Sequence, residues 1–134
     1  MLSITTKSPY AIRALTELAR TGGDAPVPIG ELARRRDIPV QFLEQLFAVL
    51  RRAGLLKSQR GVKGGYSFAR QPEDVTVLDV VEALEGRLGA DPGTDTADVW
   101  TEAIDALRLK LQAMTIAEVA QREARAAGAS MYYI

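Results

Sequence analysis

Residues 28–69 contain the most informative pattern in the chain, PIGELARRRDIPVQFLEQLFAVLRRAGLLKSQRGVKGGYSFA. A short helix is expected from Gly30 to about Arg36, then a tight turn at Asp37-Ile38-Pro39, then a second helix from about Val40 to Arg52. The second helix carries apolar residues at spacings of three and four, which predicts one buried face. These residues are Leu43, Leu46, Phe47 and Leu50. Two helices joined by a tight turn form a helix-turn-helix unit.

A basic, glycine-rich hairpin is expected directly after the second helix. Two short strands are predicted near residues 55–59 and 66–69, and the six residues between them are Arg60-Gly61-Val62-Lys63-Gly64-Gly65. A helix-turn-helix followed by such a hairpin, or wing, is a winged helix-turn-helix. The loop lacks the spacing and the Lys-Ser/Thr ending of a phosphate-binding P-loop, and it lies between strands, so we exclude that interpretation.

Further helices flank this unit on both sides. On the N-terminal side a helix is predicted over residues 10–20, capped by Thr6 or Ser8 and ended by Gly22-Gly23. An extended link over residues 25–29 then leads into the helix-turn-helix, because each proline disfavours helix in the residue before it.

On the C-terminal side, Thr76 and Asp79 are expected to open a helix that Gly86 ends. A linker over residues 87–96 leads to a long helix from about Ala97 to Met114. Residues 115–118 form a capping box for a last helix to about Ala126, after which Gly128 releases the tail. The predicted fold is therefore mainly α. It has a winged helix-turn-helix DNA-binding domain over residues 1–72 and a helical dimerisation and regulatory region over residues 73–134.

The composition narrows the chemistry that is possible. The chain has no Cys and no His, which excludes disulfides, thiolate-bound metals and histidine acid–base catalysis. We expect no catalytic residue, no metal site and no cofactor. No apolar run is long enough to cross a bilayer, and residues 1–7 do not resemble a signal peptide, so we expect a cytoplasmic protein without a membrane partner.

The charges are distributed unevenly although the net charge is zero. Residues 1–70 contain 12 Lys or Arg and 5 Asp or Glu, a balance of +7, whereas residues 71–134 have the opposite balance of −7. This asymmetry indicates an anionic partner for the first half alone, or charges that cluster by chance on solvated surfaces. The basic wing favours the first interpretation, with double-stranded DNA as the partner.

The second helix of the pair offers the polar residues that base recognition requires. Gln41 and Gln45 lie near its N-terminal end, where side chains enter the major groove, and glutamine can pair with adenine through two hydrogen bonds. Basic side chains on this helix and on the wing can neutralise phosphates. They are Arg51, Arg52, Lys57, Arg60 and Lys63.

The chain resembles the Rrf2 family of bacterial regulators. The resembling segments are residues 5–11 (TTKSPYA), 42–46 (FLEQL), 50–61 (LRRAGLLKSQRG), 64–66 (GGY) and 75–86 (VTVLDVVEALEG). The resemblance implies a homodimeric winged-helix repressor or activator. The resemblance also implies a set of DNA-contacting residues. They are Gln41, Glu44, Arg51, Arg60, the wing residues Gly61, Gly64 and Tyr66, and Thr6 and Lys7 in the first segment.

Many Rrf2 proteins hold an iron–sulfur cluster through three cysteines in the stretch that matches residues 87–105. This chain has none there, so cluster sensing does not carry over. It looks more like the branch that represses cysteine and sulfur metabolism and is controlled by complex formation with cysteine synthase. The C-terminal Tyr133 and Ile134 are the predicted partner-binding residues, because a terminal carboxylate beside an apolar side chain resembles an amino-acid substrate. The alternative is that this tail folds back onto the dimer core.

The long helix carries a heptad-like apolar seam. Its members are Trp100, Ile104, Leu107, Leu111 and Met114. Such a seam can be the chain's own core, but a helix of this length beyond a small domain favours a seam between two copies. A two-fold dimer would place two recognition helices on a pseudo-palindromic operator. The main alternative function is a winged-helix protein-interaction scaffold that does not bind DNA; no acidic pair suggests an enzyme.

Overall fold

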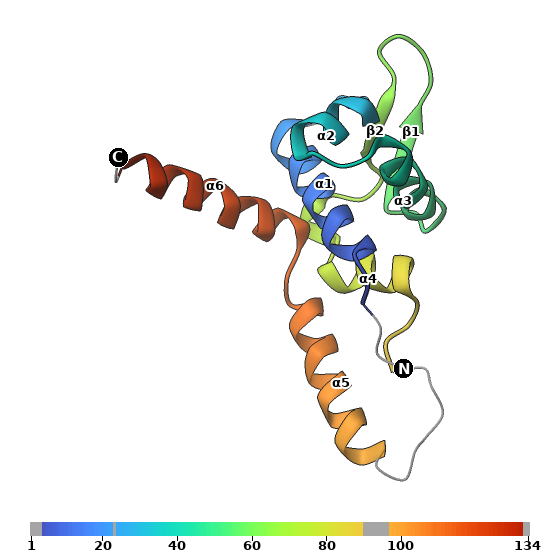
Figure 1. Cartoon of the computed structure of the whole chain (residues 1–134), viewed down its shortest axis with the longest axis vertical. Helices are drawn as coiled ribbons and strands as arrows, with labels where there is room; N and C mark the ends of the chain where they lie inside the picture. The colour runs from blue at the N-terminus through green and yellow to red at the C-terminus, as the bar shows by residue number, and fades with distance from the viewer. Residues whose placement is uncertain (1–3, 23, 90–96, 133–134) are drawn as a thin grey trace.

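The computed structural model describes residues 4–22, 24–89 and 97–132. Within them the chain forms six α-helices, a 3₁₀ turn and a two-stranded sheet (Figure 1). In chain order these are α1 (Lys7–Thr21), α2 (Ile29–Arg36), α3 (Val40–Arg52), β1 (Leu56–Gln59), β2 (Gly65–Phe68), η1 (Pro72–Asp74), α4 (Val77–Glu85), α5 (Ala97–Gln112) and α6 (Ile116–Tyr132). The predicted mainly α winged helix-turn-helix fold is confirmed.

Helices α2 and α3 form the helix-turn-helix. Asp37 adopts a left-handed conformation with φ of 55°, which aspartate tolerates better than most residues. The turn is closed by the Ile38 backbone N–H, which donates to Ala33 O at 2.9 Å. Ile38 is buried, so the turn is held both by a hydrogen bond and by burial of its apolar residue. This geometry fixes the direction in which α3 leaves α2.

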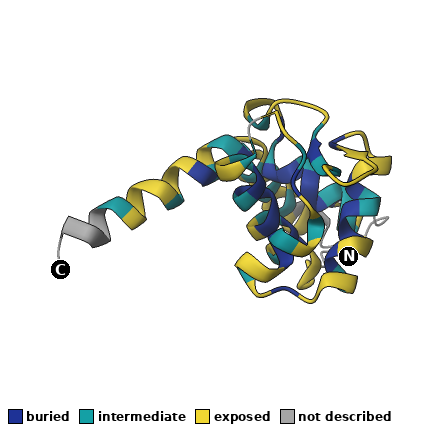
Figure 2. Cartoon of the chain, turned by 90° about the horizontal axis from the view of Figure 1, so that it is seen from above, coloured by how far each residue is buried: buried dark blue, intermediate teal, exposed yellow. Residues whose placement is uncertain are grey.

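The main core lies between α1, α2, α3 and the hairpin. Its buried residues come mostly from the first half of the chain, with Ala11, Leu15, Leu32, Phe47 and Leu50 almost fully inaccessible. Figure 2 shows this buried centre within the compact body of the molecule. Val75, Val80 and Ile116 join the same core from the second half. The winged helix is therefore completed by α4 and by the start of α6.

The wing is joined to the body through a third extended segment. Strands β1 and β2 pair antiparallel, with Leu56 opposite Phe68 and Gln59 opposite Gly65. Val27, in the link before α2, pairs with Tyr66 on the other edge of β2. The Val27 N–H donates to Tyr66 O at 2.9 Å, and the Tyr66 N–H donates to Val27 O at 2.8 Å. The base of the wing is thus held on both edges of β2.

Helices α4 and α5 share a second apolar cluster. The N-terminus of α4 has the predicted capping box: the Asp79 N–H donates to Thr76 Oγ1 and the Thr76 N–H donates to Asp79 Oδ2, both at 3.0 Å. Buried Val77, Leu78 and Val81 of α4, with Leu88, pack against residues from α5. At the end of α4, Glu82 pairs with Arg108 of α5. These contacts fix α5 against the body.

Helix α6 leaves the body after its first turns. Figures 1 and 2 show it projecting sideways, with most of its surface exposed. Glu123 ties it to the helix-turn-helix: Arg36 of α2 donates to its carboxylate at 2.9 and 2.5 Å, and Arg20 of α1 donates at 2.5 Å. Arg36 also donates to Glu17 of α1 at 2.8 Å. The Arg36 hydrogen bond is the main cause that holds the pKa of the Glu123 carboxyl below its ordinary value, and Arg20 adds to it.

We expect Glu123→Gln to lower the free energy of unfolding at neutral pH by about 0.5–1 kcal/mol, because partly exposed ion pairs are screened by water. A carboxylate with a depressed pKa stabilises the fold above its ordinary value of 4.5 and loses that effect as the pH falls through the folded pKa. The difference between wild type and variant should therefore shrink below pH 4.5. Urea titrations at several pH values measure it, with exposed Glu102→Gln in α5 as control. A difference that is independent of pH would contradict this assignment.

Three predicted helix ends were wrong. Helix α1 starts at Lys7 rather than at residue 10, and neither Thr6 nor Ser8 caps it: Thr6 makes no side-chain cap bond, and the buried Ser8 hydroxyl donates to Glu85. Helix α5 ends at Gln112, two residues early. Helix α6 continues through Gly128 to Tyr132. A glycine inside a helix costs only about 1 kcal/mol relative to alanine, and the surrounding alanines favour helix. None of the helices in the described ranges is long and apolar enough to span a membrane.

Candidate nucleic-acid interface

Helix α3 has the two faces that the sequence predicts. Its apolar face is buried, through Leu43, Leu46, Phe47 and Leu50. Gln41, Glu44 and Gln45 are exposed near its N-terminal end, as are Arg51 and Arg52 in its last turn. The surface of α3 is thus polar at the end that would enter a groove and basic at the other.

The wing is fixed directly to α3. The Phe47 and Tyr66 rings meet edge to face, with centroids 5.1 Å apart and an interplanar angle of 74°. Arg51 Nη1 donates to Ser58 Oγ of β1 at 3.2 Å. Tyr66, a predicted DNA contact, is half-buried and has its backbone paired with Val27. Its observed role is to join α3, the wing and the link before α2.

The tip of the wing is a tight turn over residues 61–64. The Gly64 N–H donates to Gly61 O at 2.9 Å, and Gly61 has a φ of 111°. A Cβ atom on Gly64 would lie 2.2 Å from Gln59 O, so only glycine fits there. The turn leaves Arg60, Val62 and Lys63 exposed. The predicted contacts Arg60, Gly61, Lys63 and Gly64 therefore lie together at the outer end of the hairpin, whereas Tyr66 lies at its base.

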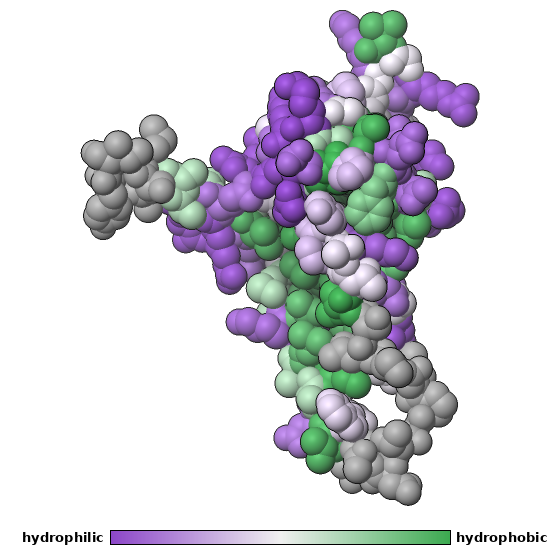
Figure 3. All heavy atoms as spheres, viewed as in Figure 1, coloured by the Kyte–Doolittle hydropathy of each residue, from purple (hydrophilic) through white to green (hydrophobic). Residues whose placement is uncertain are grey.

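The start of α1 lies beside the start of α3. Thr6 and Lys7 are exposed, and one turn further on the Tyr10 ring packs edge to face against Phe42 of α3, with centroids 5.6 Å apart. The structure thus brings the N-terminal ends of both helices together. Figure 3 shows hydrophilic side chains gathering around the wing and the neighbouring helices, and hydrophobic ones along α4 and α5.

Four of the five predicted dimer residues pack within their own chain. Ile104, Leu107, Leu111 and Met114 are half-buried against the apolar cluster of α4. The seam pattern is also compatible with this intramolecular packing, which leaves part of each side chain uncovered. Trp100, in contrast, is 61% exposed. Val99 and Leu109, which are not part of the predicted seam, are also exposed, at 69% and 68%.

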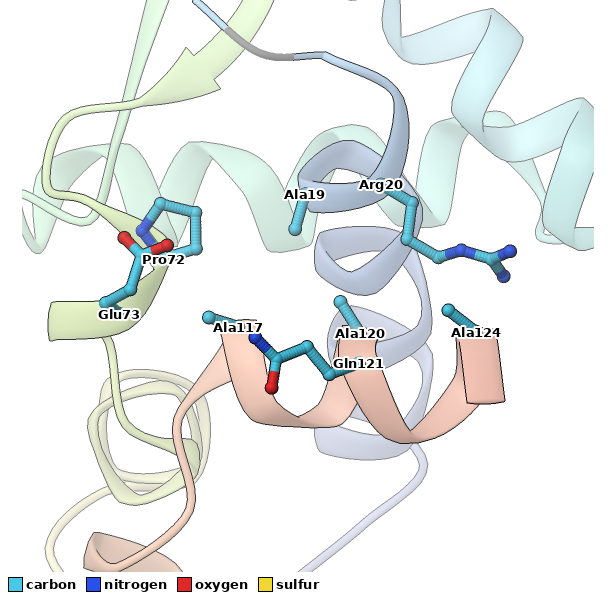
Figure 4. A pocket seen from close by; sticks show the side chains of 8 residues that line it. All are labelled: Ala19, Arg20, Pro72, Glu73, Ala117, Ala120, Gln121 and Ala124. Atoms are coloured by element: carbon cyan, nitrogen blue, oxygen red, sulfur yellow. The ribbon is translucent and has the colours of Figure 1, made fainter. Parts of the chain in front are cut away.

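A shallow groove of about 360 Å³ lies where α6 crosses α1 and η1 (Figure 4). Its lining is dominated by small side chains, with Ala19 on α1 and Ala117, Ala120 and Ala124 on α6. Arg20 extends away from Pro72 and Glu73 in this view. Its lining residues include no nucleophile paired with a general base, so they do not suggest a catalytic site.

Two features of the interface were missed by sequence reasoning. The first is the pairing of Val27 with Tyr66, although the proline-flanked link was predicted to be extended. The second is Glu85, which reaches the start of α1 from the end of α4. Neither contact is encoded in local periodicity, because each joins residues that are distant in sequence. The predicted partner residues Tyr133 and Ile134 lie outside the described residues.

A family model described as "Rrf2: Iron-dependent Transcriptional regulator" matches residues 4–122. The donor groups of this chain do not fit an iron or iron–sulfur centre. The sequence offers neither thiolate nor imidazole, and within residues 4–22, 24–89 and 97–132 no three carboxylates come together as a possible metal site. Iron therefore has no place in the mechanism proposed below.

Similar proteins cover nearly the whole chain. The protein rrf2 of Nitratidesulfovibrio vulgaris is 37% identical, over 88% of this chain and 87% of its own. The regulator CymR of Bacillus subtilis is 31% identical, over 99% of this chain and 100% of its own. Its solved structure superposes with a TM-score of 0.81, at 32% identity over 91% of this chain and 98% of its own.

The structure of IscR from T. potens gives a TM-score of 0.78, at 38% identity over 91% of this chain and 88% of its own. The regulators among these relatives are helix-turn-helix transcription factors rather than enzymes. Sequence, fold and family model agree over the winged helix and the helices that complete it. The chain belongs to the Rrf2 family of transcriptional regulators.

Proposed function

We propose that this protein is a sequence-specific DNA-binding repressor that acts as a homodimer on a pseudo-palindromic operator. The observation that carries this proposal is the rigid joining of a polar recognition surface on α3 to a basic wing. Phe47, Tyr66, Arg51 and Ser58 make that joint. A recognition helix and a wing that move as one body can contact adjacent grooves of a duplex without paying to order either element on binding.

The residues divide by the contact that each can make. Gln41, Glu44 and Gln45 are exposed at the end of α3 that enters the major groove and can read base edges. The exposed cations of α3 and the wing can pair with phosphates or reach into the minor groove. These cations are Arg51, Arg52, Lys57, Arg60 and Lys63. Lys7, with Thr6, adds a phosphate contact beside the start of α3.

We expect Arg60→Ala to weaken binding to a duplex that the wild-type protein selects from a random-sequence pool, hereafter the selected duplex. If Arg60 reads a base, the loss is about 1–3 kcal/mol and specificity relaxes at one position. If it contacts phosphate, the slope of log K against log salt falls by about one with specificity kept. Fluorescence titrations across a salt series distinguish the two cases. Arg125→Ala removes the same charge from the exposed face of α6 as a control.

The competing function is a protein-interaction scaffold without DNA affinity. Selection would then yield no duplex, and titrations would show no salt-dependent binding. The same affinity and salt slope in Arg60→Ala and Arg125→Ala would remove the wing from the mechanism.

The proposal extends to cysteine metabolism as the regulated process. Its support is the likeness to CymR, which is described as the global cysteine regulator of B. subtilis. Cysteine synthase as a partner, with Tyr133 and Ile134 as its contacts, stays a prediction, as does the cytoplasmic location. The proposed division between a DNA-binding unit at residues 1–72 and a dimerisation region at 73–134 is one of function, since both contribute to the core.

A further inference from the structure

The start of α1 is held by a residue that lies about 80 positions away. The Thr5 N–H donates to Glu85 Oε2 at 2.7 Å, the Thr5 hydroxyl donates to Oε1 at 2.9 Å, and the Ser8 hydroxyl donates to Oε2 at 3.0 Å. Ser8 is only 3% exposed. Both carboxylate oxygens are thus used: Oε1 accepts from Thr5, just before α1, and Oε2 accepts from Thr5 and from Ser8 in the first turn of α1.

Glu85 adds to a local hydrogen bond at this helix start, in which the Thr5 hydroxyl accepts from the Lys7 N–H at 3.2 Å. Thr6 occupies the cap position without a side-chain hydrogen bond. The first N–H groups of a helix have no partner within it and carry partial positive charge, so a carboxylate beside them is stabilising. Burial raises the pKa of the Glu85 carboxyl, but the hydrogen bonds from Thr5 and Ser8 outweigh that effect and hold its pKa below the ordinary value. Glu85 is therefore charged at neutral pH.

The first turn of α1 is connected to the proposed DNA-binding surface in two ways. Thr6 and Lys7, between the two anchored residues, are exposed and are the phosphate contacts of the proposed function. One turn further, Tyr10 packs against Phe42 at the start of α3. A shift of the first turn of α1 would therefore move both a phosphate contact and a support of the recognition helix.

We propose that Glu85 is a positioning residue for DNA binding: from the end of α4 it holds the first turn of α1 so that Lys7 meets a phosphate and α3 keeps its orientation. This inference rests on the proposed DNA-binding function. Glu82, three residues earlier on α4, accepts hydrogen bonds from the Leu88 N–H and from Arg108 of α5. The end of α4 thus contacts the start of α1 through Glu85 and contacts α5 through Glu82.

The test is a double-mutant cycle between Glu85 and Lys7, read as affinity and salt slope on the selected duplex. Glu85→Ala should weaken binding about 10-fold, as expected for loss of hydrogen bonds to a charged group. It should also lower the salt slope by about one, because the Lys7 contact is lost. In the Lys7→Ala background the same change should have a clearly smaller effect and leave the slope unchanged. Glu85→Gln, which keeps one acceptor oxygen, should recover part of the affinity.

Two further variants keep the test decisive. Ser8→Ala removes a single donor and should weaken binding in the same direction, even if Glu85→Ala proves too unstable to assay. Glu82→Ala breaks the contacts to α5 and should leave the salt slope at its wild-type value. Equal effects of Glu85→Ala with and without Lys7, or unchanged affinity in a folded Glu85→Ala, would overturn the positioning role while leaving the proposed function intact. Failure of the wild type to bind any duplex would overturn both.

Discussion

Gly65→Ala should disconnect the wing from the body and abolish binding to the selected duplex at concentrations that saturate the wild type. Gly65 has a φ of 148°, and a Cβ atom there would lie 2.3 Å from both the carbonyl carbon and the oxygen of Val27. Backbone atoms cannot rotate away as a flexible side chain can. The strand pairing between Val27 and Tyr66 must therefore open to admit the methyl group.

The expected cost is about 3 kcal/mol or more. Left-handed or otherwise positive φ costs an alanine about 1–2 kcal/mol, and each lost backbone hydrogen bond adds about 1 kcal/mol. For a chain of this size the melting temperature should fall by roughly 10 °C. Differential scanning calorimetry and DNA titration measure the two effects.

Gly54→Ala is the matched control. Gly54 also has a positive φ, 83°, but a Cβ atom there meets nothing within 4 Å. It should show only the cost of the backbone conformation, about 1–2 kcal/mol, and should bind DNA as wild type does. A Gly65→Ala protein that is no less stable than Gly54→Ala would mean that the Val27 pairing does not hold the wing.

The local elements of this fold were predictable because their signals are short-range. The buried face of α3 follows from a helical period over Leu43, Leu46, Phe47 and Leu50, and the box of Thr76 and Asp79 fixes where α4 starts. The hairpin was placed within one residue at each end from its glycines. In each case the residues that determine the local structure lie close together in the sequence as well as in space.

What could not be predicted depends on pairs that are far apart in the chain. No local pattern reveals that Glu85 accepts hydrogen bonds from Thr5 and Ser8 at the start of α1, or that Glu123 binds Arg36 across 87 positions. The same limit applied to the seam of α5. Its spacing correctly indicates an apolar face, but only the tertiary structure shows that α4 already covers part of that face. The candidate DNA contacts were selectable from exposure and charge, whereas the residues that position them were not.

Trp100 marks the expected contact surface of the proposed dimer. Trp100 lies on the same face of α5 as Ile104, Leu107 and Leu111, because spacings of four, three and four residues return to one side of a helix. Those three pack on the α4 cluster and are half-buried, whereas Trp100 is 61% exposed. The apolar face therefore continues past the part that α4 covers. A second copy of α5 is the partner that the proposed function requires there.

Trp100→Glu should yield monomers without unfolding the protein, since the substitution places a charge in the proposed interface and leaves the α4 contacts intact. Leu107→Asp with Leu111→Asp should also yield monomers, but with a large loss of stability, because both residues serve the chain's own cluster. Sedimentation equilibrium gives the oligomeric state, and thermal unfolding separates the two cases. Loss of the second half-site should weaken binding to the selected duplex about 100-fold or more.

Leu109→Glu supplies the control for this experiment. Leu109 is 68% exposed and lies nine residues after Trp100, which places it on the opposite side of α5 at 100° per residue. The Leu109→Glu protein should remain dimeric and bind the selected duplex normally, because Leu109 lies opposite the apolar face of α5 that α4 covers only in part. Monomers from Leu109→Glu but not from Trp100→Glu would move the interface to the other side of the helix. A wild-type monomer at micromolar concentration would end the dimer proposal, and with it the pseudo-palindromic operator, because one chain presents a single recognition helix to a single half-site.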